Sequence, residues 1–196
     1  FTGGSEGNAD CFITKLSEDG QSLIFSTYFG GTGSDWLYTL NVDSNGRIAI
    51  SGTTESDNFP TLNAHQNTRS GTLDVFIALI AADGQSLLFS SYLGTPTIDH
   101  GRQVDFDSQG NVLLAGMIGD GALGTDGVFQ EEYGGGTSDV FVAKFQTNGT
   151  LVYLTYIGGT GQEWGNDLAV DSDDNAIITG FTTSDDFPIK NAYQDE

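Results

Sequence analysis

Short runs of alternating or continuous apolar residues follow one another along the whole chain, and turn-forming residues separate them. The last third of the chain has four such runs, at 140–145, 151–157, 167–170 and 176–181. Runs of this length that are rich in β-branched and aromatic residues, and are bounded by Gly, Asn and Asp, are typical of β-strands. The sequence has no sustained helical period and no apolar run long enough to span a membrane. The pattern therefore predicts an all-β chain.

The segments between the runs predict antiparallel hairpins. Residues 146–149 join the first two runs of the last third, and Asn148-Gly149 there supplies the positive φ of a tight turn. Residues 171–174 join the last two runs, and their Asp and Ser side chains can bond their own turn backbone. We expect each set of four runs to form one four-stranded antiparallel meander.

The pattern recurs with a period of 64 residues. Residue types that recur at this spacing in three copies include Asp43, Asp107 and Asp171, Tyr28, Tyr92 and Tyr156, and Gly52, Gly116 and Gly180. Self-similarity at a fixed period is typical of repeat architectures. The chain therefore divides into three predicted copies, at 1–66, 67–130 and 131–196, the last of which includes the start of a further copy at 195–196.

Both faces of the predicted sheets are apolar. In the run 74–80, apolar residues occupy both alternating sets of positions, so neither face of that strand is polar. Sheets of this kind must be covered on both sides. Blades of a β-propeller, stacked around an axis, cover one another in this way, so we predict three four-stranded blades. A β-solenoid is the alternative architecture, although its coils are usually much shorter than this repeat.

The recurring residues resemble a known family of repeats. The first and third copies carry nearly all of a series of motifs: Asp-x-Phe-(Val/Ile)-x-Lys, Ser/Thr-x-Tyr-x-Gly-Gly, Val-Asp-Ser-x-Gly, Thr-Gly-x-Thr, Asp-x-Phe-Pro and Asn-Ala-x-Gln. This series is similar to the bacterial and archaeal β-propeller repeat often labelled SBBP. The second copy departs from it at Gly94-Thr95-Pro96, where the double glycine is broken, and at 121–129, where Phe-Pro is missing. The resemblance implies a propeller fold, a large secreted or surface protein, and no common enzymatic activity.

The charge balance excludes some partners. The chain has 27 acidic and 6 basic residues, a net charge of −21. Such a surface repels nucleic acid and anionic membranes, because binding to either depends on Lys and Arg. Two interpretations remain, a solvated acidic exterior and one that collects divalent cations such as calcium. The single cysteine, Cys11, replaces Val75 and Val140 of the other copies, which predicts a buried apolar role.

The sequence does not predict a catalytic site. Its only histidines, His65 and His100, stand at different repeat positions, and no nucleophile elbow of the Gly-x-Ser-x-Gly type is present. Acidic residues are numerous enough for a carboxylate pair that hydrolyses polysaccharides. However, the repeated aspartates recur identically, as turn-forming residues would. We therefore expect a protein that is not an enzyme.

One candidate site is a calcium site. Asp171, Asp173 and Asn175 have the i, i+2, i+4 spacing of the first ligands of an EF-hand loop. The glycine and the bidentate glutamate of that loop are missing, since Ala176 and Thr182 stand in their places. A hairpin turn explains the same residues.

A second candidate is an acidic residue followed by an aromatic one, which recurs in all three copies. These ligand-binding candidates are Asp35, Trp36, Asp99, His100, Glu163 and Trp164. Aromatic rings beside carboxylates can bind sugars, and they can equally pack one blade on the next.

Together these features predict a non-enzymatic, extracellular or cell-surface structural module of an adhesive or fibre-forming protein. The alternative is a carbohydrate-binding or calcium-dependent adhesion domain, and an enzyme acting on polysaccharides is the least favoured. The expected partners are neighbouring blades or copies of the chain itself, and glycans or surface proteins. Three blades are too few for a ring of about four to eight. An excerpt of a longer chain, a six-bladed ring of two chains and a fibre therefore all stay open.

Overall fold

A computed structural model describes residues 9–194 of the chain. This part contains twelve β-strands and no helix, and so none that could cross a membrane, which confirms the all-β prediction. The start of a further copy, expected at 195–196, lies outside the described residues. The strands are β1 (Cys11–Leu16), β2 (Leu23–Phe29), β3 (Asp35–Val42), β4 (Ile48–Thr54), β5 (Asp74–Ile80), β6 (Leu87–Leu93), β7 (His100–Phe106), β8 (Val112–Ile118), β9 (Asp139–Phe145), β10 (Leu151–Ile157), β11 (Glu163–Val170) and β12 (Ala176–Thr182).

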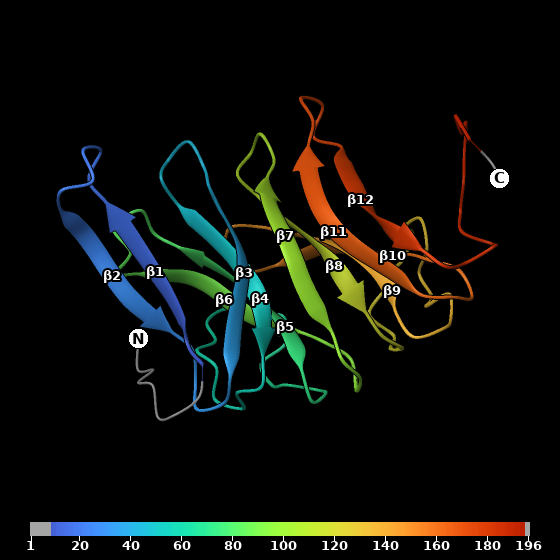
Figure 1. Cartoon of the computed structure of the whole chain (residues 1–196), viewed down its shortest axis with the longest axis horizontal. Coiled ribbons are helices and arrows are strands. Elements are labelled where there is room, and N and C mark those ends of the chain that lie inside the picture. The colour runs from blue at the N-terminus through green and yellow to red at the C-terminus, as the bar shows by residue number, and fades with distance from the viewer. Residues whose placement is uncertain (1–8, 195–196) are drawn as a thin grey trace.

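The strands form four antiparallel sheets in chain order (Figure 1). Two sheets have four strands, β3-β4-β5-β6 and β7-β8-β9-β10, and two have only two, β1-β2 and β11-β12. The two-stranded sheets, which we call the end sheets, lie at opposite ends of the array. Hairpin turns join β1 to β2, β3 to β4, β5 to β6, β7 to β8, β9 to β10 and β11 to β12, as predicted, and Gly149 has a φ of 86° in the turn between β9 and β10.

The grouping of strands into sheets differs from the expectation, and the three predicted four-stranded sheets are not found. Each four-stranded sheet combines the third and fourth strands of one copy with the first and second strands of the next. The physical reason is the burial of β5, which has two apolar faces. Between β4 and β6 it occupies a central position, where all seven of its residues are buried. As the first strand of a meander it would lie at an exposed edge.

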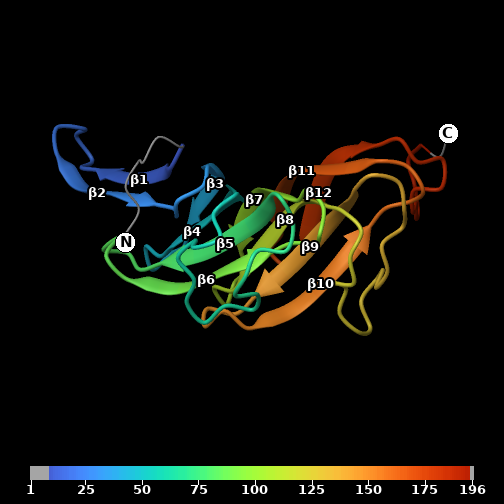
Figure 2. The same ribbon diagram turned by 90° about the horizontal axis from the view of Figure 1, so that it is seen from below.

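The four sheets pack face to face (Figure 2). Cys11 and Ile13 of β1 are buried against Phe76 of the next sheet, in one apolar cluster. A second cluster joins the two four-stranded sheets, and a third joins the second of them to β11-β12. The prediction that the four-stranded sheets are covered on both faces is therefore confirmed, as is the buried role of Cys11.

The first strands of three successive sheets, β3, β7 and β11, run side by side (Figure 1), and we call them the first-strand row. Polar groups link them. Asn41 Nδ2 donates a hydrogen bond to Asp105 Oδ1 at 2.7 Å, and Val170 N donates to Asp105 Oδ2 at 2.9 Å. Gln103 also accepts a hydrogen bond from Thr39. These contacts fix the row on which the candidate site lies.

One irregular turn has a structural role. Asp174 stands where the other copies have a hairpin glycine, and its φ of 64° is in the left-handed region. Its carboxylate accepts hydrogen bonds from the backbone N and the Oγ of Ser108, each at 2.7 Å. The aspartate therefore ties its hairpin to the equivalent hairpin of the preceding copy.

Candidate functional site

The structure separates the acid–aromatic pairs into two sets of side chains. The three acids are buried: Asp35 and Glu163 are the first residues of β3 and β11, and Asp99 immediately precedes β7. The aromatic residue that follows points to the other side of the strand, since successive side chains alternate. The pairs therefore do not form three joint sites.

The buried acids hold the glycine-rich turns that lead into the first strands. Asp35 Oδ2 accepts hydrogen bonds from Gly31 N at 2.7 Å and from Ser56 Oγ at 2.9 Å. Asp99 accepts from Thr95 N at 2.6 Å, and Glu163 accepts from Gly159 N at 3.1 Å. Burial raises the pKa of Asp99 to about 6, although its hydrogen bonds act in the opposite direction. Each acid is thus fully engaged with the loops of its own sheet.

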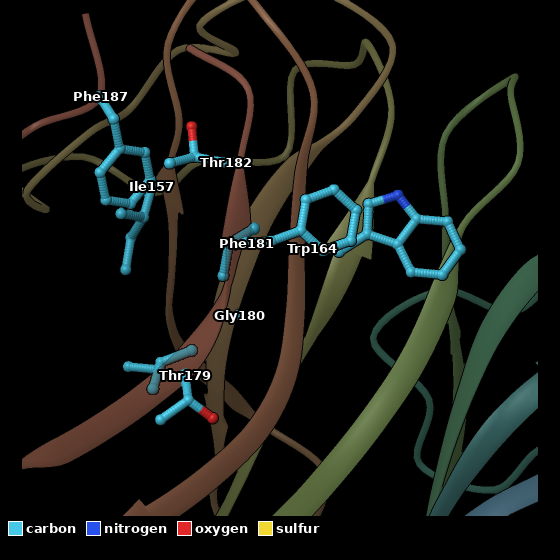
Figure 3. Close-up of a pocket in the computed structure, with 9 residues that line it drawn as sticks. Ile157, Trp164, Thr179, Gly180, Phe181, Thr182 and Phe187 are labelled. Carbon is cyan, nitrogen blue, oxygen red and sulfur yellow. The ribbon is translucent and has the colours of Figure 1, made fainter. Parts of the chain in front are cut away.

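The aromatic residues gather along the first-strand row. The ring of His100 lies 5.9 Å from that of Trp164 and 6.3 Å from that of Tyr38, between centroids. Trp164 also stacks on Phe181 of β12, with centroids 5.9 Å apart and an interplanar angle of 18° (Figure 3). Trp36 occupies the equivalent position on β3 and is half-exposed. Ring contacts therefore link Tyr38 of the first copy, His100 of the second, and Trp164 and Phe181 of the third.

Arg102 belongs to this cluster, although the sequence pattern did not indicate it. Its guanidinium carbon lies 5.0 Å from the ring centroid of Tyr38 and 5.1 Å from that of Trp164. Such stacking on two rings is favourable for a cation. Within residues 9–194 its guanidinium has no carboxylate partner, and its Nε is buried without a hydrogen-bond acceptor. We call Tyr38, His100, Arg102 and Trp164 the aromatic–arginine cluster.

The cluster carries further unpaired polar atoms. His100 Nδ1 and Trp164 Nε1 are buried and have no hydrogen-bond partner in the described residues. Burial lowers the pKa of His100, and the charge of Arg102 lowers it further, so the imidazole is neutral at pH 7. Arg102 is therefore the positive group of the cluster.

The repeat position of Arg102 holds a different residue in each copy, so recurrence does not point to it. Tyr38, Arg102 and Asn166 are 64 residues apart, two positions after the aromatic residue of each pair. In the structure each stands at a register shift in its strand pair. Such β-bulges re-aim a side chain. Strict alternation of side chains along a strand does not predict the direction of these three side chains.

The proposed calcium residues form the hairpin turn between β11 and β12. Asp171 Oδ1 accepts hydrogen bonds from the backbone N of Asp173 at 2.9 Å and of Asn175 at 2.8 Å. Asn175 Nδ2 donates to Asp171 Oδ2 at 2.9 Å, and these bonds lower the pKa of Asp171. Residues 9–194 contain no group of three or more His, Cys, Asp or Glu side chains placed to hold a metal ion.

We expect calcium at millimolar concentration to shift the melting temperature by less than about 1 °C, because the turn already uses the Asp171 carboxylate. Differential scanning fluorimetry with calcium and, as the control, with magnesium at equal ionic strength measures this. A rise of several degrees that is specific to calcium would show that Asp171, Asp173 and Asn175 bind the ion.

No protein-family model matches the chain, and no curated protein sequence matches it either.

Proposed function

We propose that the chain is a segment of a β-propeller, and that it serves as a non-enzymatic structural and interaction module of a cell-surface, adhesive or fibre-forming protein. The stack of antiparallel sheets, with their first strands side by side, supports the propeller arrangement. The resemblance of the repeated motifs to the SBBP repeat points the same way.

The observation that best supports a structural role is that the buried acids bind the backbone of turns. A hydrolase needs carboxylates that face a substrate. Asp35, Asp99 and Glu163 instead accept hydrogen bonds from backbone N–H groups of the turns, in the same way in each copy. Asp43 and Asp107 likewise close hairpins, and they pair with Arg47 and Lys144 at 2.6 and 2.7 Å. These carboxylates stabilise a scaffold that presents its loops.

The surface location is tested in cells that naturally make the protein. Protease added to intact cells is expected to digest the protein, and fractionation is expected to recover it with the envelope or the medium. A cytosolic marker protein provides the control for lysis. Full protection in intact cells, with recovery alongside the marker, would contradict an extracellular module.

A second candidate function is binding of a carboxylated glycan, and the aromatic–arginine cluster favours it. Trp164 and Tyr38 offer flat faces, and Arg102 offers a cation without a carboxylate partner in the described residues. A guanidinium fork matches a carboxylate geometrically. Acidic sugars combine the two features, a ring with an apolar face and a carboxylate.

We expect Arg102→Gln to weaken binding of oligogalacturonate at least tenfold, because the charge is lost while the strand is kept. Isothermal titration calorimetry measures this, with neutral oligosaccharides as matched ligands and Arg69→Gln, which removes a surface cation elsewhere, as the control variant. Equal affinity of wild type and Arg102→Gln, or no binding by the wild type, would exclude this function.

A further inference from the structure

The same repeat position is buried in the four-stranded sheets and exposed in the end sheets. Phe76 and Phe141 are 0% exposed, whereas their equivalent in the first copy, Phe12 of β1, is 69% exposed. At the other end, Ile177 and Phe181 of β12 are 54% and 47% exposed. The end sheets therefore carry side chains that this repeat buries wherever a sheet is complete.

The two end sheets are complementary halves of one sheet. In the complete sheets, β4 pairs with β5 and β8 with β9. The repeat equivalents of these partners are β12 and β1, and within the described residues each pairs on one edge only. Backbone groups on both free edges can therefore form the ladder that the chain itself makes twice.

The internal pairing also fixes the register between the free edges. Gly52 lies opposite Phe76, and Thr53 lies opposite Val75. Transferred to the equivalent positions, this register places Gly180 of β12 opposite Phe12 of β1. It also places Phe181 opposite Cys11.

A cavity is present where this register would place Phe12. In the complete sheet the ring of Phe76 packs against Phe29 and Phe59, with centroids 6.3 and 4.6 Å away. The equivalents of these two residues beside β12 are Ile157 and Phe187. Together with Gly180 they line an apolar cavity of about 310 Å³ (Figure 3).

We infer that β12 of one copy of the chain pairs antiparallel with β1 of a second copy. The four-stranded sheet β11-β12-β1-β2 formed in this way buries Phe12 of the second copy in the cavity beside Gly180. The inference rests on the proposed structural role and names the partner of the end sheets.

A second copy fits both the shape and the sequence of the free edge. Its strand β1 carries the aromatic residue, Phe12, that this register places in the cavity. The internal pairs β4–β5 and β8–β9 provide the pattern for this pairing. The contact is head to tail, since different surfaces meet, and it therefore continues until a ring closes or a filament grows. Each copy carries a net charge of −21, so association is expected to strengthen as salt screens the repulsion.

The register is tested by a disulfide between copies. In Phe181→Cys the new thiol lies opposite the native Cys11 of the second copy. Paired residues of antiparallel strands have Cα atoms about 4.5–5.5 Å apart, within the range that a disulfide spans. Burial raises the pKa of Cys11 to about 12, so little reactive thiolate forms and an oxidant such as copper phenanthroline is needed. We expect most of the chain to become covalent dimer or higher multimer on a non-reducing gel.

Ile177→Cys is the matched control. It also replaces an exposed apolar residue on the same face of β12, but its thiol would lie opposite Lys15, roughly 13 Å along the strand from Cys11. The double variant Phe181→Cys with Cys11→Ser should not cross-link. Equal cross-linking at positions 177 and 181, or none at 181, would overturn the inferred register.

Phe12→Asp tests the pairing without a cysteine. Phe12 is exposed in the single chain, so its replacement should leave the fold intact while placing a charge in the cavity of the partner. We expect association to weaken at least 100-fold by sedimentation velocity, and Val152→Asp, at an exposed position of β10, to leave it unchanged. A wild-type chain that is monomeric at 100 μM would overturn the pairing. This holds even where the protein is found at the cell surface, since the two tests are independent.

Discussion

Phe76→Ala is expected to lower the free energy of unfolding by about 3–5 kcal/mol, whereas Phe12→Ala in the monomeric chain is expected to change it by less than about 1 kcal/mol. The two residues occupy the same repeat position. Phe76 packs in the centre of a complete sheet, against Phe29 and Phe59, and its removal leaves a cavity. Phe12 is 69% exposed, so its replacement removes little buried apolar surface.

Urea unfolding of both variants at low protein concentration measures this difference. Working below the concentration at which copies associate is essential, because assembly would bury Phe12 as well. Similar losses for the two variants would contradict the grouping of strands, since they would mean that β1 is as enclosed as β5.

Asp139→Asn is expected to stabilise the protein at pH 7.5 by roughly 1–2 kcal/mol and to have almost no effect at pH 4. Asp139 is buried, and its Oδ1 has no hydrogen-bond partner in the described residues. Burial, together with the negative charge of the nearby Glu163, raises the pKa of its carboxyl to about 6. Asparagine removes the charge and keeps the oxygen that accepts from Gly134 N at 2.7 Å.

The direction of the pH dependence follows from the number of protons that the folded and unfolded chains bind. Between about pH 4 and 6 the folded protein keeps a proton on Asp139 that the unfolded chain has released, so the unfolding free energy falls as pH rises through this range. Above pH 6 the folded protein buries Asp139 in its charged form. The free energy of unfolding is then lowered by the full desolvation penalty of this carboxylate.

Chemical denaturation at pH 4 and at pH 7.5 measures the effect. Asp171→Asn is the control for simple loss of a negative charge. It should destabilise at pH 7.5, because hydrogen bonds in the turn favour its charged form and lower its pKa. Equal stabilisation by both variants would attribute the effect to the overall charge and not to burial of Asp139.

The strands and the repeat could be predicted from the sequence. The strand and turn patterns are local, and they recur at a fixed spacing. Asn148-Gly149 and the recurring aspartates specify turns, and the two apolar faces of 74–80 predict burial. The grouping into sheets could not be predicted in the same way. It depends on the long connection at 55–73, part of which runs along β6 through bridges from Leu62 and Gln66, so that β5 returns to pair with β4. The local pattern of apolar and polar residues does not indicate pairing across such a connection.

The candidate site was predicted in part. Trp36, His100 and Trp164 were identified from their recurrence, and the structure places them on the first-strand row. Their acidic neighbours have a different role, as anchors of turns, because they lie on the opposite side of the strands. Arg102 could not be identified, since only the bulge in β7 brings its guanidinium over the rings of Tyr38 and Trp164.

Pairing of the end sheets would extend the scaffold from one copy of the chain to the next. Light scattering coupled to size exclusion, on the wild-type chain of 20.7 kDa at 0.3 M salt, measures whether this pairing occurs. We expect a mass of two or more chains, which falls to that of one chain in Phe12→Asp. A wild-type protein that elutes as a stable 20.7 kDa monomer at every concentration would contradict it.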